Sequence, residues 1–217
     1  MTITESPPDT DTPVAPSPDA APAGLFELVS TDRHTVVGRL WIGGAVLAFC
    51  ATAVLGVLVA FETVDAADVT IFGGVNAYFQ MWTLHRVALA LFVVAPLFVG
   101  LATLVVPLQV GAPNIAFPRA AVAAWWSWLL GTGITVAAVF AGGGWGALDG
   151  VTGDERDAIA LTLAGTGLVV VALLLGILCV AATVIALRAP GLTLARVPAF
   201  SWSMLVTASV WLLTLPV

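Results

Sequence analysis

Long apolar segments alternate with short polar ones along most of this chain. Five of these segments carry few or no charged residues, and each is long enough to cross a hydrocarbon layer of about 30 Å as an α-helix rising about 1.5 Å per residue. The expected spans cover residues 40–61, 79–107, 120–141, 158–187 and 197–217, and Pro96 predicts a kink in the second. The pattern therefore predicts an all-α, polytopic membrane protein with about five transmembrane helices.

Residues 1–24 have a different composition from the rest. They hold six prolines and four acidic residues, with no basic residue and no apolar segment. A secretory signal peptide needs a basic start and an apolar centre, so this segment is not one. We expect a disordered, acidic and Pro-rich tail over residues 1–24, followed by one transmembrane domain over residues 25–217.

The overall composition supports lipid as the solvent. Hydrophobic residues make up 60% of the chain, charged residues 9%, and the mean hydropathy is +1.06. No basic patch or nucleic-acid motif occurs, so nucleic acid is not an expected partner. Cys50 and Cys179 lie in separate apolar segments without another cysteine or a histidine nearby, which favours small buried residues over a disulfide or a metal site.

The charged residues between the spans predict an orientation. All seven basic residues are arginines. Loops that are rich in arginine or lysine face the cytoplasm in most membrane proteins. With five spans, residues 33–39, Arg119 and residues 188–196 fall on one side, while the acidic loops at residues 62–68 and 149–157 fall on the other. We therefore expect a multi-pass protein of the cell (plasma) inner membrane with a cytoplasmic N-terminus.

Two further segments have simple interpretations. Residues 141–158, AGGGWGALDGVTGDERDA, are rich in glycine but follow no strand, so they predict a solvated outer loop and not a phosphate-binding loop. Six tryptophans lie near predicted span ends and are typical of an interfacial aromatic belt. They are Trp41, Trp82, Trp125, Trp126, Trp128 and Trp202.

The candidate chemistry lies at the outer end of the second span, where His85 precedes Arg86. Ionisable groups inside a membrane are expensive, and a neutral imidazole is a good iron ligand. A haem held between helices would explain a histidine at this depth. The alternative is an interfacial histidine that bonds water or a backbone carbonyl.

Three motifs resemble subunit I of the haem–copper oxidases, of the cytochrome c oxidase type. They are STDRHTVVGRLW at residues 30–41, LHRVALALFVVAPLFVGLATLVVPLQVGAPNIAFPRA at residues 84–120, and RAPGLTLARVPAFSW at residues 188–202. They occur in the family's order and topology, so the resemblance covers the chain from about residue 28 to residue 217. It implies the N-terminal part of the cytochrome oxidase subunit I helix bundle.

The resemblance implies that His85 is one axial ligand of a low-spin haem of unknown type. Arg86 stands where the family usually has glycine, and it could pair with a haem propionate or block the pocket. Ala60 stands where the family has an arginine that contacts the haem, while Glu62 is retained.

The proton-entry positions of the family are also changed. The entrance aspartate is Asn114, and nearby asparagines are replaced by Thr103, Ala121 and Cys179. An amide cannot accept and release a proton in place of a carboxyl group, so we expect this pathway to be inactive.

The family's copper ligands, its second low-spin ligand and its high-spin ligand would lie beyond residue 217. The chain has two histidines, so it supplies at most one axial ligand, has no copper site, and is not an oxidase by itself. The first hypothesis is a membrane component of an aerobic respiratory electron-transfer complex, completed by other subunits or by a C-terminal-half chain that carries the missing histidines.

Two alternatives belong to other classes. The chain could be a haem-free, degenerate homologue that acts as a membrane scaffold or assembly partner, as the changed haem and proton positions suggest. A small-solute transporter is disfavoured, because the span centres hold only serine, threonine and cysteine as polar groups.

Overall fold

The computed structural model describes residues 31, 33–64, 70–146 and 152–215, and within these residues it contains helices and no strands. Four helical stretches are long and apolar enough to span a membrane: α2 (His34–Val64), the continuous stretch Val75–Val110, α5 (Pro118–Phe140) and α6 (Asp154–Ala186). A shorter apolar helix, α7 (Ala199–Thr214), follows a single 3-10 turn, η2 (Leu194–Arg196). The predicted all-α membrane fold is confirmed.

The four long helical stretches begin before the spans expected from hydropathy. For example, α2 starts at His34 instead of residue 40, and α6 starts at Asp154 instead of residue 158. The fifth expected span, residues 197–217, is represented by the 16 residues of α7, which at about 1.5 Å per residue is shorter than a membrane crossing. The expected tail over residues 1–24 lies outside the described residues.

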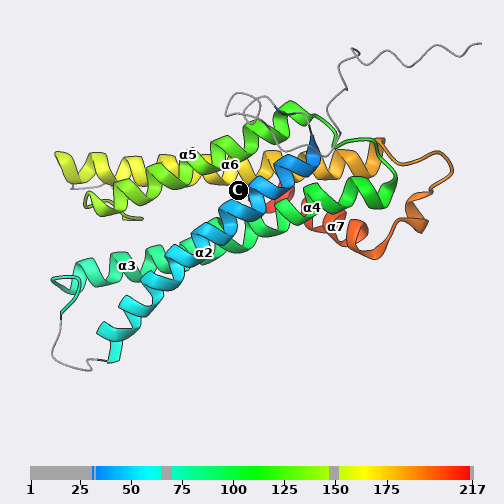
Figure 1. The fold of residues 1–217 in the computed structure, drawn as a ribbon. Helices are drawn as coiled ribbons and strands as arrows, with labels where there is room; N and C mark the ends of the chain where they lie inside the picture. The colour runs from blue at the N-terminus through cyan, green and yellow to red at the C-terminus, as the bar shows by residue number, and fades with distance from the viewer. Residues whose placement is uncertain (1–30, 32, 65–69, 147–151, 216–217) are drawn as a thin grey trace, which may run out of the picture.

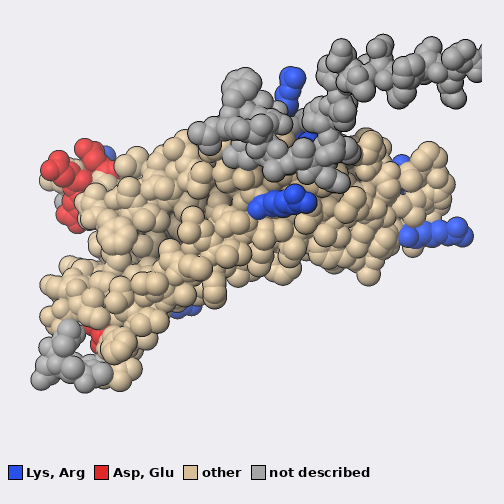
Figure 2. All heavy atoms as spheres, in the orientation of Figure 1, with Lys and Arg blue, Asp and Glu red and all other residues tan. Residues whose placement is uncertain are grey.

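The helices form two pairs that cross near their middle (Figure 1). The first pair is α2 with the stretch Val75–Val110, and the second pair is α5 with α6. Helix α7 packs against α6 and against α4 (Ala95–Val110). At one end, α3 (Val75–Val87) and the end of α2 diverge from α5 and α6. Acidic side chains gather at this end, and arginines lie mostly toward the opposite end, so we call them the acidic end and the arginine end (Figure 2).

Glycines make the close helix contacts possible. A Cβ atom on Gly131 of α5 would lie 2.9 Å from the Gly165 carbonyl oxygen of α6, and one on Gly100 would lie 2.7 Å from the Trp41 Cβ atom of α2. Small residues at such contacts allow two backbones to approach, which is how helices associate in lipid.

The second stretch is not one regular helix. It consists of α3 (Val75–Val87), a seven-residue π-helix η1 (Ala88–Val94) and α4 (Ala95–Val110). The π-helix ends at Val94, two residues before Pro96, where the sequence predicts a kink. Proline lacks the backbone N–H that an α-helix needs at this point, so the irregular turn has an identifiable cause.

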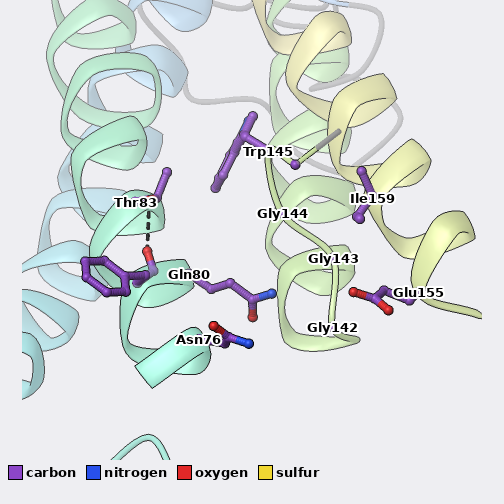
Figure 3. A pocket seen from close by; sticks show the side chains of 11 residues that line it. Asn76, Gln80, Thr83, Gly142, Gly143, Gly144, Trp145, Glu155 and Ile159 are labelled. Atoms are coloured by element: carbon purple, nitrogen blue, oxygen red, sulfur yellow. Dashed lines mark hydrogen bonds between the residues drawn. The ribbon is translucent and has the colours of Figure 1, made fainter. Parts of the chain in front are cut away.

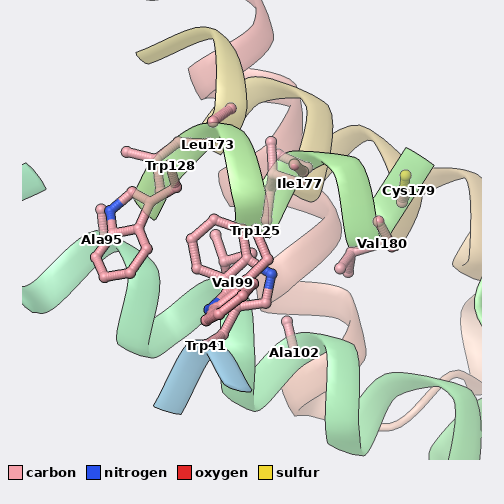
Figure 4. Packing of buried hydrophobic residues seen from close by; sticks show 14 of the residues in the cluster. Trp41, Ala95, Val99, Ala102, Trp125, Trp128, Leu173, Ile177, Cys179 and Val180 are labelled. Atoms are coloured by element: carbon pink, nitrogen blue, oxygen red, sulfur yellow. The ribbon is translucent and has the colours of Figure 1, made fainter. Parts of the chain in front are cut away.

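The expected tryptophan belt is wrong for three of its six members. Trp41 and Trp128 are each 1% exposed, Trp125 is 7% exposed, and all three belong to the hydrophobic core (Figure 4). The Trp41 and Trp128 ring centroids are 5.4 Å apart. A position near a span end does not tell whether an indole faces lipid or a neighbouring helix. Here these three indoles face neighbouring helices.

We expect Gly131→Ala to lower the free energy of unfolding by about 1–3 kcal/mol, because the added methyl group meets α6 backbone atoms that cannot move separately. Gly133→Ala is the matched control, since a Cβ there would have no neighbour within 4 Å. Denaturation of both variants in mixed detergent and SDS micelles measures the difference. Equal stability would contradict the proposed close contact.

Candidate functional site

His85 lies on α3 and is half-buried, with its ring against α2. Its Nδ1 atom is 3.2 Å from the carbonyl oxygen of Thr52. Because a carbonyl oxygen only accepts hydrogen bonds, the Nδ1 atom must donate. In the neutral imidazole the proton therefore sits on Nδ1 and the lone pair on Nε2, which is the form that binds a metal through Nε2.

Gly56 makes this contact possible. A Cβ atom at position 56 would lie 2.6 Å from the Cε1 atom of His85 and 3.2 Å from its Nδ1 atom. The ring thus occupies space on α2 that any other residue would fill. Together, the Thr52 carbonyl and Gly56 set both the proton position and the ring position of His85.

Arg86 is exposed and turns away from this contact. Its guanidinium carbon lies 4.6 Å from the centroid of the Trp82 ring, a cation–π contact worth about 0.5–1 kcal/mol at an exposed site. Arg86 has no ion pair among the described residues. The structure therefore places the two predicted site residues next to each other without joining them in one contact.

An apolar cavity of about 290 Å³ lies near His85, between α2, the η1 region and α5. Thr52 and Leu84 line it together with Thr132, whose hydroxyl is buried and has no hydrogen-bond partner among the described residues. His85 does not line this cavity. A group bound to His85 would therefore have to lie on another side of the ring.

A second cavity, of about 440 Å³, opens at the acidic end (Figure 3). Asn76, Gln80 and Thr83 of α3 face the glycine segment at residues 142–146 and Glu155 of α6. The first part of the expected outer loop thus packs against α6 instead of being wholly solvated. The sequence interpretation missed these polar residues, although their spacing of four and three positions marks one helix face.

Glu62, which the resemblance marks as retained, has a local role. Its Oε2 atom accepts hydrogen bonds from the backbone N–H groups of Ile71 at 3.2 Å and Phe72 at 3.0 Å. The carboxylate therefore ties the end of α2 to the segment that leads into α3.

Asn114 lies at the arginine end and is held by His34. Its Oδ1 atom accepts hydrogen bonds from the His34 backbone N–H at 3.2 Å, the His34 Nδ1 atom at 3.1 Å and the Ile115 backbone N–H at 2.8 Å. These contacts fix the loop between α4 and α5 against the start of α2. An amide in this position does not release a proton.

The two histidines are far apart. His34 begins α2, and Thr52, the partner of His85, comes 18 positions later on the same helix, a distance of about 27 Å at about 1.5 Å per residue. In the part of the chain that the structure describes, no three histidine, cysteine or acidic side chains could hold a metal ion together. Within one chain, His85 has no second histidine as a partner.

Comparison with known proteins agrees with this arrangement. Residues 36–217 match the family described as cytochrome c and quinol oxidase polypeptide I. The chain belongs to this family, and it is a multi-pass membrane protein of the haem–copper oxidase subunit I type.

Three bacterial relatives show which part of the family fold is present. The chain is 32% identical over 204 residues to a probable cytochrome c oxidase subunit 1-beta of Nocardia farcinica, covering 89% of this chain and 34% of the relative. It is 32% identical over 207 residues to a probable subunit 1-alpha of Streptomyces coelicolor, with the same coverage. It is 37% identical over 148 residues to cytochrome c oxidase subunit 1 of Cereibacter sphaeroides, covering 63% of this chain and 26% of that protein. The chain thus spans about a third of the length of the first two relatives.

We expect Gly56→Ala to displace the His85 ring and break its hydrogen bond to Thr52, because the added methyl group and the ring claim the same space. NMR of 15N-histidine-labelled protein measures this, since neutral imidazoles protonated on Nδ1 or Nε2 have different 15N shifts. Gly43→Ala, where a Cβ has no neighbour within 4 Å, is the control on the same helix. An unchanged His85 signal in Gly56→Ala would show that the ring does not rest on α2.

Proposed function

We propose that this chain is a membrane component of an aerobic respiratory electron-transfer complex, and that His85 supplies one axial ligand to a low-spin haem. The hydrogen bond from His85 Nδ1 to the Thr52 carbonyl is the observation that carries the proposal. Histidine ligands usually donate their other ring N–H to such an acceptor, which fixes the tautomer and the orientation of the ring.

The residues around His85 fit the role of a ligand support. Gly56 and the Thr52 carbonyl hold the ring through the backbone of α2, so the imidazole keeps its position without another polar side chain. When bound, a low-spin haem supplies one-electron transfer, and the Nε2 lone pair of His85 is what this chain contributes to it.

Arg86 is the second residue that we assign to the haem. It is exposed, it follows His85 directly, and among the described residues its cation is balanced only by the Trp82 ring. Pairing with a haem propionate would replace that contact, at a cost of about 0.5–1 kcal/mol, by a bidentate pair with a carboxylate. The proposed roles are therefore iron ligand for His85 and propionate partner for Arg86.

The remaining ligands must come from outside these residues. The second axial histidine and the copper ligands would be supplied by a C-terminal-half chain or by other subunits of the complex. Helix α2 offers a large apolar surface for such a partner, because only 17% of its most apolar window is buried, against 44–56% in the other three spans. At Asn114, which is bound to His34, we propose that no proton enters.

The first test is a reduced-minus-oxidised optical spectrum of the purified chain, recorded with and without co-expression of its genomic neighbours. We expect a low-spin haem band that disappears in His85→Ala, because the iron loses its nitrogen ligand. His34→Gln is the control, since it removes the other histidine about 27 Å away along α2. If wild-type protein shows no band under either condition, the haem proposal fails, and a haem-free scaffold or assembly partner becomes the better description.

We also propose that the N-terminus is cytoplasmic, because the arginine end would then face the cytoplasm. Thr152 precedes α6 at the acidic end, and Thr193 lies in the loop after α6 at the other end. In a background without native cysteines, a membrane-impermeant maleimide should label Thr152→Cys in intact cells and Thr193→Cys only after permeabilisation. The reverse labelling would show the opposite orientation.

A further inference from the structure

The backbone around Pro96 leaves one carbonyl group without its usual donor. In the π-helix that precedes this proline, the Ala95 N–H bonds the carbonyl of Ala90, five residues earlier. The same spacing would assign the next N–H, that of residue 96, to the carbonyl of Leu91. Proline has no N–H, so Leu91 needs a donor from elsewhere.

Trp128 of α5 supplies this donor. Its Nε1 atom lies 3.2 Å from the Leu91 carbonyl oxygen. The side chain is 1% exposed, and Figure 4 shows it beside Ala95, at the junction between η1 and α4. In lipid, where water cannot reach the backbone, such a carbonyl is satisfied by protein or not at all.

The Trp128 indole is itself fixed by α2. A Cβ atom at Gly44 would lie 2.8 Å from its Cζ3 atom, so the ring fills the space that this glycine leaves. The Trp41 ring packs on it at 5.4 Å between centroids, tilted by 43°. The Trp128 indole is therefore fixed by Gly44 and Trp41 of α2, the same helix on which the His85 ring packs.

The turn that Trp128 stabilises separates two parts of the same span, and each part packs on α2. On one side, Gly100 of α4 is in close contact with Trp41 of α2. On the other side, His85 of α3 lies on Gly56. A π turn holds one more residue than an α turn, and each residue of an α-helix turns the chain by about 100°. If the extra residue were absorbed into a regular helix, α3 would rotate against α4 and His85 would leave α2.

We propose that Trp128 is the positioning residue for His85: by donating to the Leu91 carbonyl it holds the π turn, and the π turn points the imidazole at Thr52 and Gly56. The inference rests on the proposed function only in taking His85 as a haem ligand. The rotation of α3 is a property of the chain without haem, and it can be measured there.

The test uses the full chain in lipid bilayers, without haem, with 15N-labelled histidine. All samples carry His34→Gln, so that His85 is the only imidazole. The parent protein should give one neutral signal set, protonated on Nδ1. Trp128→Phe keeps an aromatic ring but removes the indole N–H, and we expect loss of this single signal set and the appearance of the form protonated on Nε2.

Trp126→Phe is the matched control. It makes the same substitution two positions earlier on α5, and the Trp126 indole N–H is buried without a hydrogen-bond partner among the described residues. We expect its His85 signals to equal those of the parent. A Trp128→Phe spectrum that also equals the parent spectrum would overturn the proposal.

Pro96→Ala provides a rescue experiment. It restores a backbone N–H at position 96. This N–H can donate to the Leu91 carbonyl, which has no donor in Trp128→Phe. The double variant should regain the parent's single His85 signal set, protonated on Nδ1, even if Trp128→Phe alone is poorly folded by circular dichroism. Failure of Pro96→Ala to restore the signal set protonated on Nδ1 would show that Trp128 does not act through this carbonyl.

The outcomes separate this inference from the proposed function. If wild-type protein never shows a haem band while Trp128→Phe changes the His85 tautomer, the haem assignment fails and the positioning role stands. If the haem band depends on His85 but Trp128→Phe leaves both the band and the tautomer unchanged, the positioning role fails alone.

Discussion

A backbone carbonyl that loses its donor inside a membrane must find another, since no water is available to replace it. Pro96 creates this situation in the span that carries His85, and the Trp128 indole resolves it from α5. Because the indole rests in turn on Gly44 and Trp41, one hydrogen bond connects three helices. The packing of the central core and the irregular turn between α3 and α4 therefore both depend on supplying a donor to the Leu91 carbonyl.

The chemistry of His85 also depends on a backbone group. The Thr52 carbonyl decides which ring nitrogen carries the proton, and Gly56 decides how close the ring can approach. Neither contact uses a polar side chain of another residue. This explains how a histidine can keep the form suited to a metal in a region whose neighbours are otherwise apolar.

Sequence reasoning recovered the features that follow from long averages and from recognisable motifs. Apolar runs gave the helices, and the motifs around His85 and Asn114 gave the family, which the matches over residues 36–217 confirm. Features that depend on a particular neighbour were missed. Trp128 near a span end has the same hydropathy whether it faces lipid or α2, and a proline predicts an interruption without telling that a seven-residue π-helix precedes it. The stripe of Asn76, Gln80 and Thr83 was visible, but its partner across the cavity was not.

The glycines of α2 are made before the two aromatic rings that pack on them. This helix is made before α3 and α5, and the rings of His85 and Trp128 pack on its glycines, Gly56 and Gly44. His85 is made before Trp128, so under the proposed positioning role its imidazole settles on Thr52 and Gly56 only after α5 has been inserted. Until α5 is inserted, the Leu91 carbonyl lacks the donor that Trp128 provides. The insertion of α5 therefore completes the hydrogen bonding of the span that contains Pro96.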